Sequence, residues 1–190
     1  DGDIKLNLEN GIKINSNFNS EFKFDNKLSK KYLNSFNKFK YLDYIKSLKA
    51  KLNNNIFIDL DNTYKLVDYN YSISGKLKSG QINFHGISKN DYISEEIKEI
   101  YLSNLQIKTS IKPNLINLKG EGKYSFNNTD FLKIYLENNI NKDKLNLILD
   151  FDYKNNLEKN LINFKKKKGS TANLFLNIER ERDILKIINL

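Results

Sequence analysis

The stretch LKAKLNNNIFIDLDNTYKLVDYNYSISGKLKSGQINF, residues 48–84, decides the fold of this chain. In both halves apolar residues recur at every second position, and mostly Lys, Asn, Asp and Ser stand between them. A period of two gives a strand one apolar face and one wet face. The turn formers Asp61, Asn62 and Thr63 separate the halves. We therefore predict two long antiparallel strands joined as a hairpin. The apolar positions are Leu48, Ala50, Leu52, Ile56, Ile58 and Leu60, then Val67, Tyr69, Tyr71, Ile73, Gly75 and Leu77.

Upstream, residues 1–27 alternate in the same way and are predicted to form a meander of strands. Asn10-Gly11 is a hairpin signal, because both residue types accept positive φ angles. From Leu28 the apolar spacing changes to three or four residues, and Ser29 occupies an N-cap position. This spacing predicts a short amphipathic helix near residues 29–39, inside a helix or connection covering 28–45.

Downstream, residues 46–190 are predicted to be long antiparallel strands. Turns are expected at Pro113-Asn114 and over Asn141 to Lys144, and an edge strand over Ile184 to Leu190. The segment 94–100 is interpreted as a polar connection with room for one helical turn. Strands and helices do not alternate, which argues against a parallel sheet. The predicted fold class is mainly β: an elongated, twisted antiparallel sheet of about ten strands, curved as a trough, with one short helix near residues 29–39.

The chain is strongly basic, with 32 Lys and Arg against 23 Asp and Glu and a net charge of +9. Such a charge fits an anionic partner, but a genome rich in A and T would also favour Lys, Asn and Ile codons. Cysteine is absent, which excludes disulfides, thiolate catalysis and thiolate metal ligands. No apolar run reaches the ~18 residues that span a bilayer. We expect the chain to be a single β-rich segment of a longer repetitive protein, with any anchor or export signal outside it.

One motif points to an enzyme. IFIDLDNT, residues 56–63, resembles the first motif of the haloacid dehalogenase superfamily, a strand that ends in Asp-x-Asp-x-Thr. The resemblance would make Asp59 a nucleophile and Asp61 a general acid beside Mg²⁺. That family continues with a helical segment, whereas residues 64–77 alternate as a strand. The turn of a hairpin is therefore the favoured interpretation.

Other isolated features indicate no catalytic, cofactor or metal site. His85 is the only histidine, so a transition-metal site lacks its usual companions. The run Lys165–Lys168, followed by Gly169-Ser170, is interpreted as a solvated loop, with contact to phosphate as the alternative. Aromatic residues beside lysines could stack nucleic-acid bases. They share a face with Ile and Leu, however, which favours burial or lipid contact, and no nucleic-acid partner is expected.

The long alternating strands, with NTYKLVDYNYSISGKLKSGQINF (62–84) and LINLKGEGKYSF (115–126), resemble the β-rich repeats of the AsmA-like family, of the YhdP and TamB type. The resemblance covers roughly Leu48 to the C-terminus. It implies a non-enzymatic β-groove in the bacterial periplasm, tied to the inner membrane by a segment outside this chain. It also implies a part in phospholipid transport between membranes and in outer-membrane integrity.

The alternation agrees with that implication, because a trough with an apolar inside can hold acyl chains without directional contacts. The alternatives are a structural or protein-interaction β module without lipid, then nucleic-acid binding, then the phosphatase. A closed sandwich core would give the same alternation. The predicted partners are phospholipid acyl chains, and membranes through segments outside this chain. The residues expected to contact lipid are Ile56, Ile58, Leu60, Tyr69, Tyr71, Ile73, Leu118, Tyr124, Leu147, Leu149 and Phe151.

Overall fold

The computed structural model describes residues 2–8, 11–25, 44–87, 97–154, 157–159 and 164–189. Within these ranges ten strands form one antiparallel sheet, and β9 (Leu157–Lys159) pairs separately with β10 (Phe164–Lys166). The ten strands are β1 (Gly2–Asn7), β2 (Ile12–Asp25), β3 (Ile45–Leu60), β4 (Leu66–Ile87), β5 (Ile97–Lys112), β6 (Leu115–Ser125), β7 (Leu132–Asn141), β8 (Lys144–Tyr153), β11 (Ala172–Glu181) and β12 (Ile184–Asn189).

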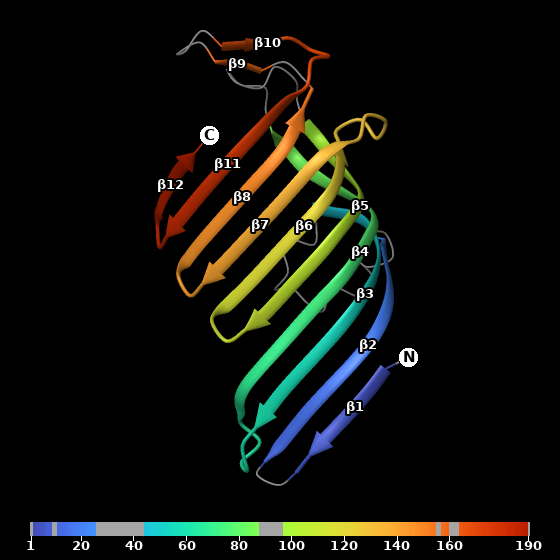
Figure 1. Cartoon of the computed structure of the whole chain (residues 1–190), viewed down its shortest axis with the longest axis vertical. Coiled ribbons are helices and arrows are strands. Elements are labelled where there is room, and N and C mark those ends of the chain that lie inside the picture. Colours follow the sequence, from blue (N-terminus) through green and yellow to red (C-terminus); the bar gives the residue numbers. More distant parts are fainter. Residues whose placement is uncertain are drawn as a thin grey trace.

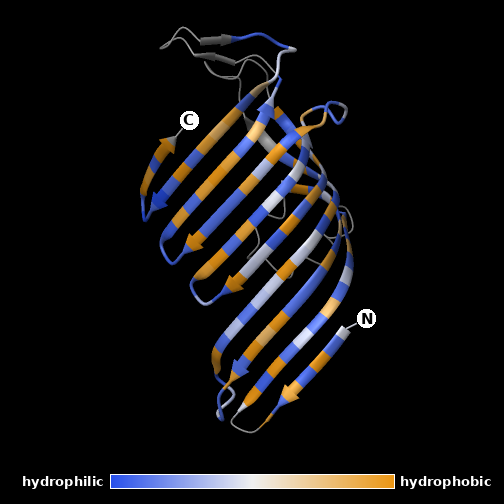
Figure 2. Ribbon diagram, in the orientation of Figure 1, coloured by the Kyte–Doolittle hydropathy of each residue, from blue (hydrophilic) through white to orange (hydrophobic). Residues whose placement is uncertain are grey.

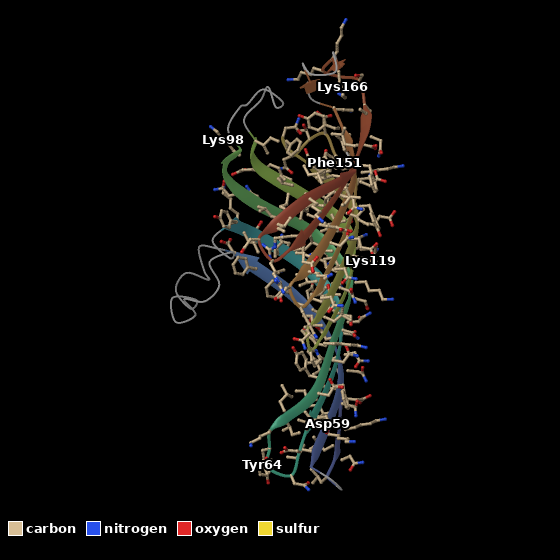
Figure 3. All side chains as sticks on the ribbon, turned by 90° about the vertical axis from the view of Figure 1, so that its left-hand side faces the viewer. Asp59, Tyr64, Lys98, Lys119, Phe151 and Lys166 are labelled. Carbon is tan, nitrogen blue, oxygen red and sulfur yellow. The ribbon has the colours of Figure 1, made fainter. Side chains whose placement is uncertain are left out.

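The sheet is an open meander in which neighbours in sequence are neighbours in space, in the order β1-β2-β3-β4-β5-β6-β7-β8-β11-β12 (Figure 1). The one interruption is the β9–β10 hairpin, which projects beyond one end of the sheet between β8 and β11. Seen edge-on, the sheet is curved, and the ends of β3, β4 and β5 on the side of Lys98 curl away from the rest of the layer (Figure 3). The predicted fold class, an elongated and curved antiparallel sheet of about ten strands, is confirmed.

Of the two predicted connections, one falls outside the described residues and the other needs correction. The helix predicted near 29–39 lies outside the described residues. The predicted polar connection over 94–100 is wrong for its second part, because β5 begins at Ile97 and that side chain is buried. A register shift between Asn83 and Ile87 of β4 breaks the regular pairing with β5 there. Residues 97–100 read Ile-Lys-Glu-Ile, which lacks the period of two, so the start of β5 could not be recognised in the sequence.

Three hairpin turns fall where the sequence predicts them, at Asp61–Thr63, Pro113-Asn114 and Asn141–Lys144, and a further turn joins β11 to β12. Tyr64, Asn114, Lys142 and Arg182 each have a φ angle between 51° and 61°, one in each of four turns. Adjacent turns are also joined, since the Lys142 N–H donates to the Asn114 carbonyl at 2.8 Å and the Arg182 N–H to the Asp143 carbonyl at 3.2 Å. These bonds hold the turns at one edge of the trough in a row.

Bulges curve the sheet and take some residues out of the regular strand pairing. Leu60 pairs with Leu66 and Asp59 with Asp68, so Val67 has no register partner and is 61% exposed. Val67 is thus the extra residue of a bulge, and its place in the apolar row stays a prediction. A second shift lies between Ser103 and Gln106, where Asn104 has a φ angle of 54°. Such bulges increase the local twist of a sheet.

Gly122 makes this second bulge possible. A Cβ atom at this position would lie 2.6 Å from the Leu105 Cα and 2.8 Å from the Asn104 carbonyl oxygen. Only a residue without a side chain lets β6 approach the bulged strand this closely. The glycine that interrupts the alternating pattern of β6 is thus a packing requirement.

The buried core is small. Ala50, Leu77 and Leu105 sit next to the register shifts on β3, β4 and β5 and form one buried cluster. Leu48, Leu52, Leu102 and Ile107 pack around it and are partly buried. Most other apolar residues of the sheet are only half-buried. The sheet therefore buries its apolar face mainly through contacts between neighbouring side chains.

Candidate functional site: the apolar face of the sheet

The strand register brings the predicted lipid-contacting residues onto one face. Ile56 pairs with Tyr71, and Ile58 with Tyr69. Further along the sheet, Leu147, Leu149 and Phe151 of β8 lie opposite apolar-face positions of β7 and β11. Following the pairs from strand to strand places all eleven predicted residues on the same side, which we call the apolar face. Figure 2 shows the underlying alternation of hydrophobic and hydrophilic residues along the strands.

The apolar face has no second layer over it within the described ranges. In Figure 3 the sheet is a single curved layer, and Lys119 points away from the side toward which the strands curl. Burial agrees, since ten of the eleven predicted residues are half-buried and only Tyr124 is fully buried. Exposure is highest at the edges, where Leu6 of β1 is 62% and Ile187 of β12 is 61% exposed. In the described part of the chain, the apolar face is an open surface and no sandwich core.

An aromatic corner closes one end of this face. The Tyr124 ring packs edge-on against Phe126 and Phe151, with centroids 5.2 Å and 6.0 Å away, and Phe126 packs against Tyr153 at 6.4 Å. The Tyr124 hydroxyl donates to the Asp152 carbonyl at 2.6 Å. Burial, followed by the nearby Tyr153 and Asp152, raises the pKa of Tyr124 well above its ordinary value. Tyr124 is thus a neutral anchor at every physiological pH.

A polar network interrupts the apolar face, and the sequence analysis missed it. The Asn54 side chain is only 5% exposed and donates to the Ser20 hydroxyl at 2.9 Å, while its carbonyl oxygen accepts the Tyr71 hydroxyl at 2.9 Å. These bonds satisfy an amide that would otherwise be costly to bury. The sequence contains a sign of this network, because Asn54 is a polar residue at an apolar position of the alternation, between Leu52 and Ile56.

The opposite, polar face is held by ion pairs and hydrogen bonds between strands. The Glu99 carboxylate of β5 accepts from Lys46, from the Tyr101 hydroxyl and, at 2.9 Å, from the Gln81 amide. The hydrogen bond from Lys46 and that from Tyr101 lower the pKa of Glu99 to about 2. Lys119 and Glu137 pair across β6 and β7 at 2.8 Å. These contacts link β3 and β4 to β5, and β6 to β7, on the face away from the apolar residues.

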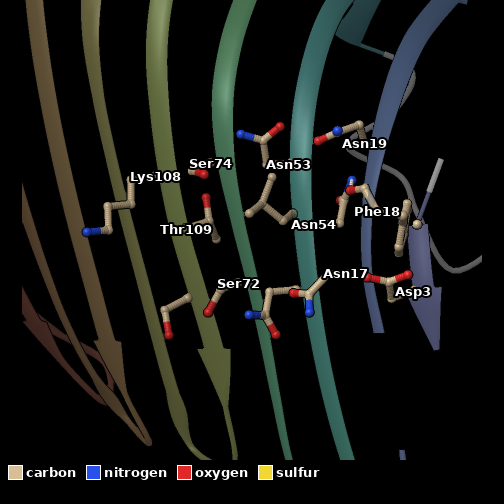
Figure 4. A pocket seen from close by; sticks show the side chains of 14 residues that line it. Asp3, Asn17, Phe18, Asn19, Asn53, Asn54, Ser72, Ser74, Lys108 and Thr109 are labelled. Atoms are coloured by element: carbon tan, nitrogen blue, oxygen red, sulfur yellow. Dashed lines mark hydrogen bonds between the residues drawn. The ribbon is translucent and has the colours of Figure 1, made fainter. Parts of the chain in front are cut away.

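The polar face also carries a hollow of about 650 Å³ over β1 to β5 (Figure 4). Amide and hydroxyl side chains supply most of its side-chain lining, with Asp3 and Lys108 as the charged members. The sequence analysis did not find this hollow. Its lining residues come from five strands, and only the register shows that they lie side by side. The uncharged members that face the hollow are Asn17, Asn19, Asn53, Asn55, Ser72, Ser74 and Ser110.

The two carboxylates of the phosphatase-like motif serve the hairpin in this structure. Asp61 accepts the Thr63 hydroxyl and backbone N–H, both at 2.7 Å, and the Lys65 N–H at 3.0 Å. The Thr63 side chain contributes most to lowering the pKa of Asp61. Asp59 lies on the polar face, 3.8 Å from the Lys13 ammonium. Both flanking strands run antiparallel to β3, unlike the parallel strand end that the motif requires.

The remaining sequence candidates are only partly placed. His85 falls in β4, but its side chain is outside the described part of the structure. The predicted loop at Lys165–Lys168 is wrong in its first half, since Lys165 and Lys166 belong to β10. The Lys166 ammonium lies 5.6 Å above the Tyr153 ring, and burial lowers its pKa. In the residues that the structure describes, no cluster of three or more His, Cys, Asp or Glu could hold a metal ion.

Comparison with protein-family models, with curated proteins and with solved structures finds no match to this chain. Over its described ranges, the chain contains no helix with the length and apolar character needed to cross a bilayer.

Proposed function

We propose that this chain is a non-enzymatic groove segment whose apolar face contacts the acyl chains of phospholipids. The resemblance to AsmA-like proteins extends the proposal to phospholipid transport between membranes, in a bacterial periplasm. In that setting an anchor outside this chain would hold the segment to the inner membrane.

The observation that carries the proposal is the apolar face on a single curved layer, in which apolar positions predominate although Asn54, Thr109 and Asn138 interrupt one row. The apolar positions continue across the register from β2 to β11, and the described residues place nothing over them. Exposed apolar surface costs roughly 25 cal/mol per Å², so a large open face favours an apolar ligand or partner. Acyl chains fit such a face because they need no directional bonds.

The two faces of β4 provide a direct test. Ile73 pairs with Asn54 and Thr109 on the apolar face, whereas its neighbour Ser72 pairs with Asn55 and Ser110 on the polar face. A photo-crosslinking residue is placed at either position in cells that express the chain, and the purified protein is analysed by mass spectrometry. We expect phospholipid adducts at position 73 and none at position 72. An organic extract of the uncrosslinked protein should contain phospholipid as well.

Equal labelling at the two positions, or lipid at neither, would refute the proposal. A protein partner is the second candidate, because β12 leaves Ile184, Leu185 and Ile187 about 60–63% exposed on a sheet edge that no described strand covers. Unpaired edges recruit further strands. Crosslinking to protein at position 73, with no lipid in the extract, would support this second candidate.

A further inference from the structure

The polar face contains a row of side chains that carries no charge across seven strands. Each member pairs with the next in the strand register, from β2 to β8. The next row on the same face contains Lys108, Lys119 and Glu137, so exposure to water does not by itself select neutral side chains. We call these residues the neutral row: Asn17, Asn55, Ser72, Ser110, Asn117, Asn139 and Asn146.

The hollow lies where a second set of neutral side chains runs beside the neutral row. Asn19 pairs with Asn53, and Asn53 with Ser74, one step further along the same strands. Figure 4 shows these amides and hydroxyls around the hollow, with Lys108 and Asp3 at opposite ends. A volume of about 650 Å³ is within the range of small-ligand sites.

The amides of the hollow have unused hydrogen-bonding capacity. Within the described part of the chain, the side chains of Asn17, Asn19, Asn53 and Asn55 bond to no other side chain or backbone group. Ser72 makes one long contact, 3.4 Å to Asn70. On the adjacent row of this face, by contrast, Lys119 is paired with Glu137. Each amide offers two donors and an acceptor, and all four are exposed.

We propose that this hollow binds a neutral glycan. Sugar hydroxyls donate and accept at the same time, which matches a surface of amides and hydroxyls. Strand neighbours repeat at about 4.8 Å across the sheet and alternate positions at about 6.6 Å along it. A grid with this spacing offers bonds to several consecutive sugar rings. The site lies on the face opposite the proposed lipid surface and does not depend on that function.

Other ligand classes fit this hollow less well. Phosphate groups are bound by clusters of Arg and Lys, whereas the hollow has one lysine, Lys108, at one end and the carboxylate of Asp3 at the other. An acyl chain would leave the amides unpaired, which costs free energy. An extended peptide would bond to the backbone at a sheet edge, whereas the hollow lies over β1 to β5, most of which are interior strands. The half-buried Phe57, two residues from Asn55 on the same face, adds an apolar ring beside the site.

The experiment maps binding on the protein by NMR. Maltohexaose, cellohexaose and chitohexaose are each titrated to millimolar concentration into the isotope-labelled 190-residue chain. We expect the side-chain amide signals of Asn17, Asn53 and Asn55 to shift with at least one of them. Because the neutral row has no charge, the affinity should not change with salt concentration.

A matched pair of variants localises the effect. Asn17 and Asn55 are a cross-strand pair in the hollow, and Lys123 and Lys133 are a cross-strand pair on the same face outside it. Asn17→Ala with Asn55→Ala should weaken binding roughly tenfold, because two amide contacts are lost. Lys123→Ala with Lys133→Ala should leave the affinity within about twofold.

Three outcomes would overturn the proposal. The first is no shift at the hollow with any of the three oligosaccharides. The second is an equal loss of affinity in both double variants. The third is affinity that falls steeply with salt, which would indicate an anionic ligand. Unchanged amide dispersion in each variant spectrum shows that the variant is folded, so that a lost signal reports binding.

Discussion

At the scale of single residues, buried and paired polar groups fix the register between the strands. An alternating strand can shift by two residues and keep its apolar face, so alternation alone leaves the register open. Asn54 removes that freedom on β3, because its amide must meet Ser20 of β2 and the Tyr71 hydroxyl of β4. On the other face, Glu99 does the same for β3, β4 and β5 through Lys46 and Gln81.

The buried amide gives the first prediction. Asn54→Ala should lower the free energy of unfolding by about 1–3 kcal/mol, since the Tyr71 hydroxyl loses its acceptor in a buried site. The neighbouring Asn53→Ala should change it by less than about 0.5 kcal/mol, because that side chain is exposed and has no partner in the described structure. Urea denaturation of both variants measures the difference, and equal losses would contradict the assigned network.

Glu99 gives a prediction on pH. Its pKa in the folded state is lowered from 4.5 to about 2, so its contacts stabilise the fold at any pH above 4.5. As the pH falls from 4.5 toward 2, the Glu99 carboxylate takes up a proton in the unfolded chain before it does so in the folded protein. The stabilisation from its contacts is therefore progressively lost. The stability advantage of the wild type over Glu99→Gln should therefore be largest near neutral pH and vanish near pH 2. Urea unfolding across this range measures it, and a constant difference would refute the assignment.

At the scale of the elements, bulges shape the sheet. β4 covers 22 residues, and straight strands of this length would make a flat ribbon. Register shifts in β3–β4, β4–β5 and β5–β6 add twist where the strands curl. These shifts gather the small core of Ala50, Leu77 and Leu105. The trough is therefore built by local irregularities in otherwise uniform strands.

Two glycines on β6 test the role of the bulge. Gly122→Ala should destabilise the fold by roughly 1–3 kcal/mol, because the new Cβ would meet backbone atoms of β5 at 2.6–2.9 Å. Gly120→Ala is the matched control, since its Cβ would have its nearest neighbour, the Leu105 Cδ2 atom, at 3.9 Å. Gly120→Ala should be neutral or stabilising, as alanine restricts the unfolded chain. Thermal unfolding followed by circular dichroism distinguishes the two, and similar shifts in melting temperature would count against the close approach.

At the scale of the whole molecule, a single open layer differs from a closed domain in size. A compact globule of this length has a radius of gyration of about 16 Å. Small-angle X-ray scattering of the 190-residue chain should give a clearly larger value, because ten strands lie side by side in one layer. The far-ultraviolet circular dichroism spectrum should be dominated by strand. A radius near that of a compact globule would indicate that the sheet folds over to cover its apolar face.

The amino-acid sequence determined which side of each strand is apolar, because side chains alternate strictly along an extended backbone. It also determined the turns at Asp61–Thr63, Pro113-Asn114 and Asn141–Lys144, where residue type limits the backbone locally. The tertiary structure decided the bulge at Val67, the burial of Asn54 and the grouping of Asn17, Asn55 and Ser72 around one hollow. Each of these depends on which residues of different strands lie opposite one another. For the described residues it also decided between an open layer and a sandwich, because alternation gives a strand one apolar face and leaves open what covers that face.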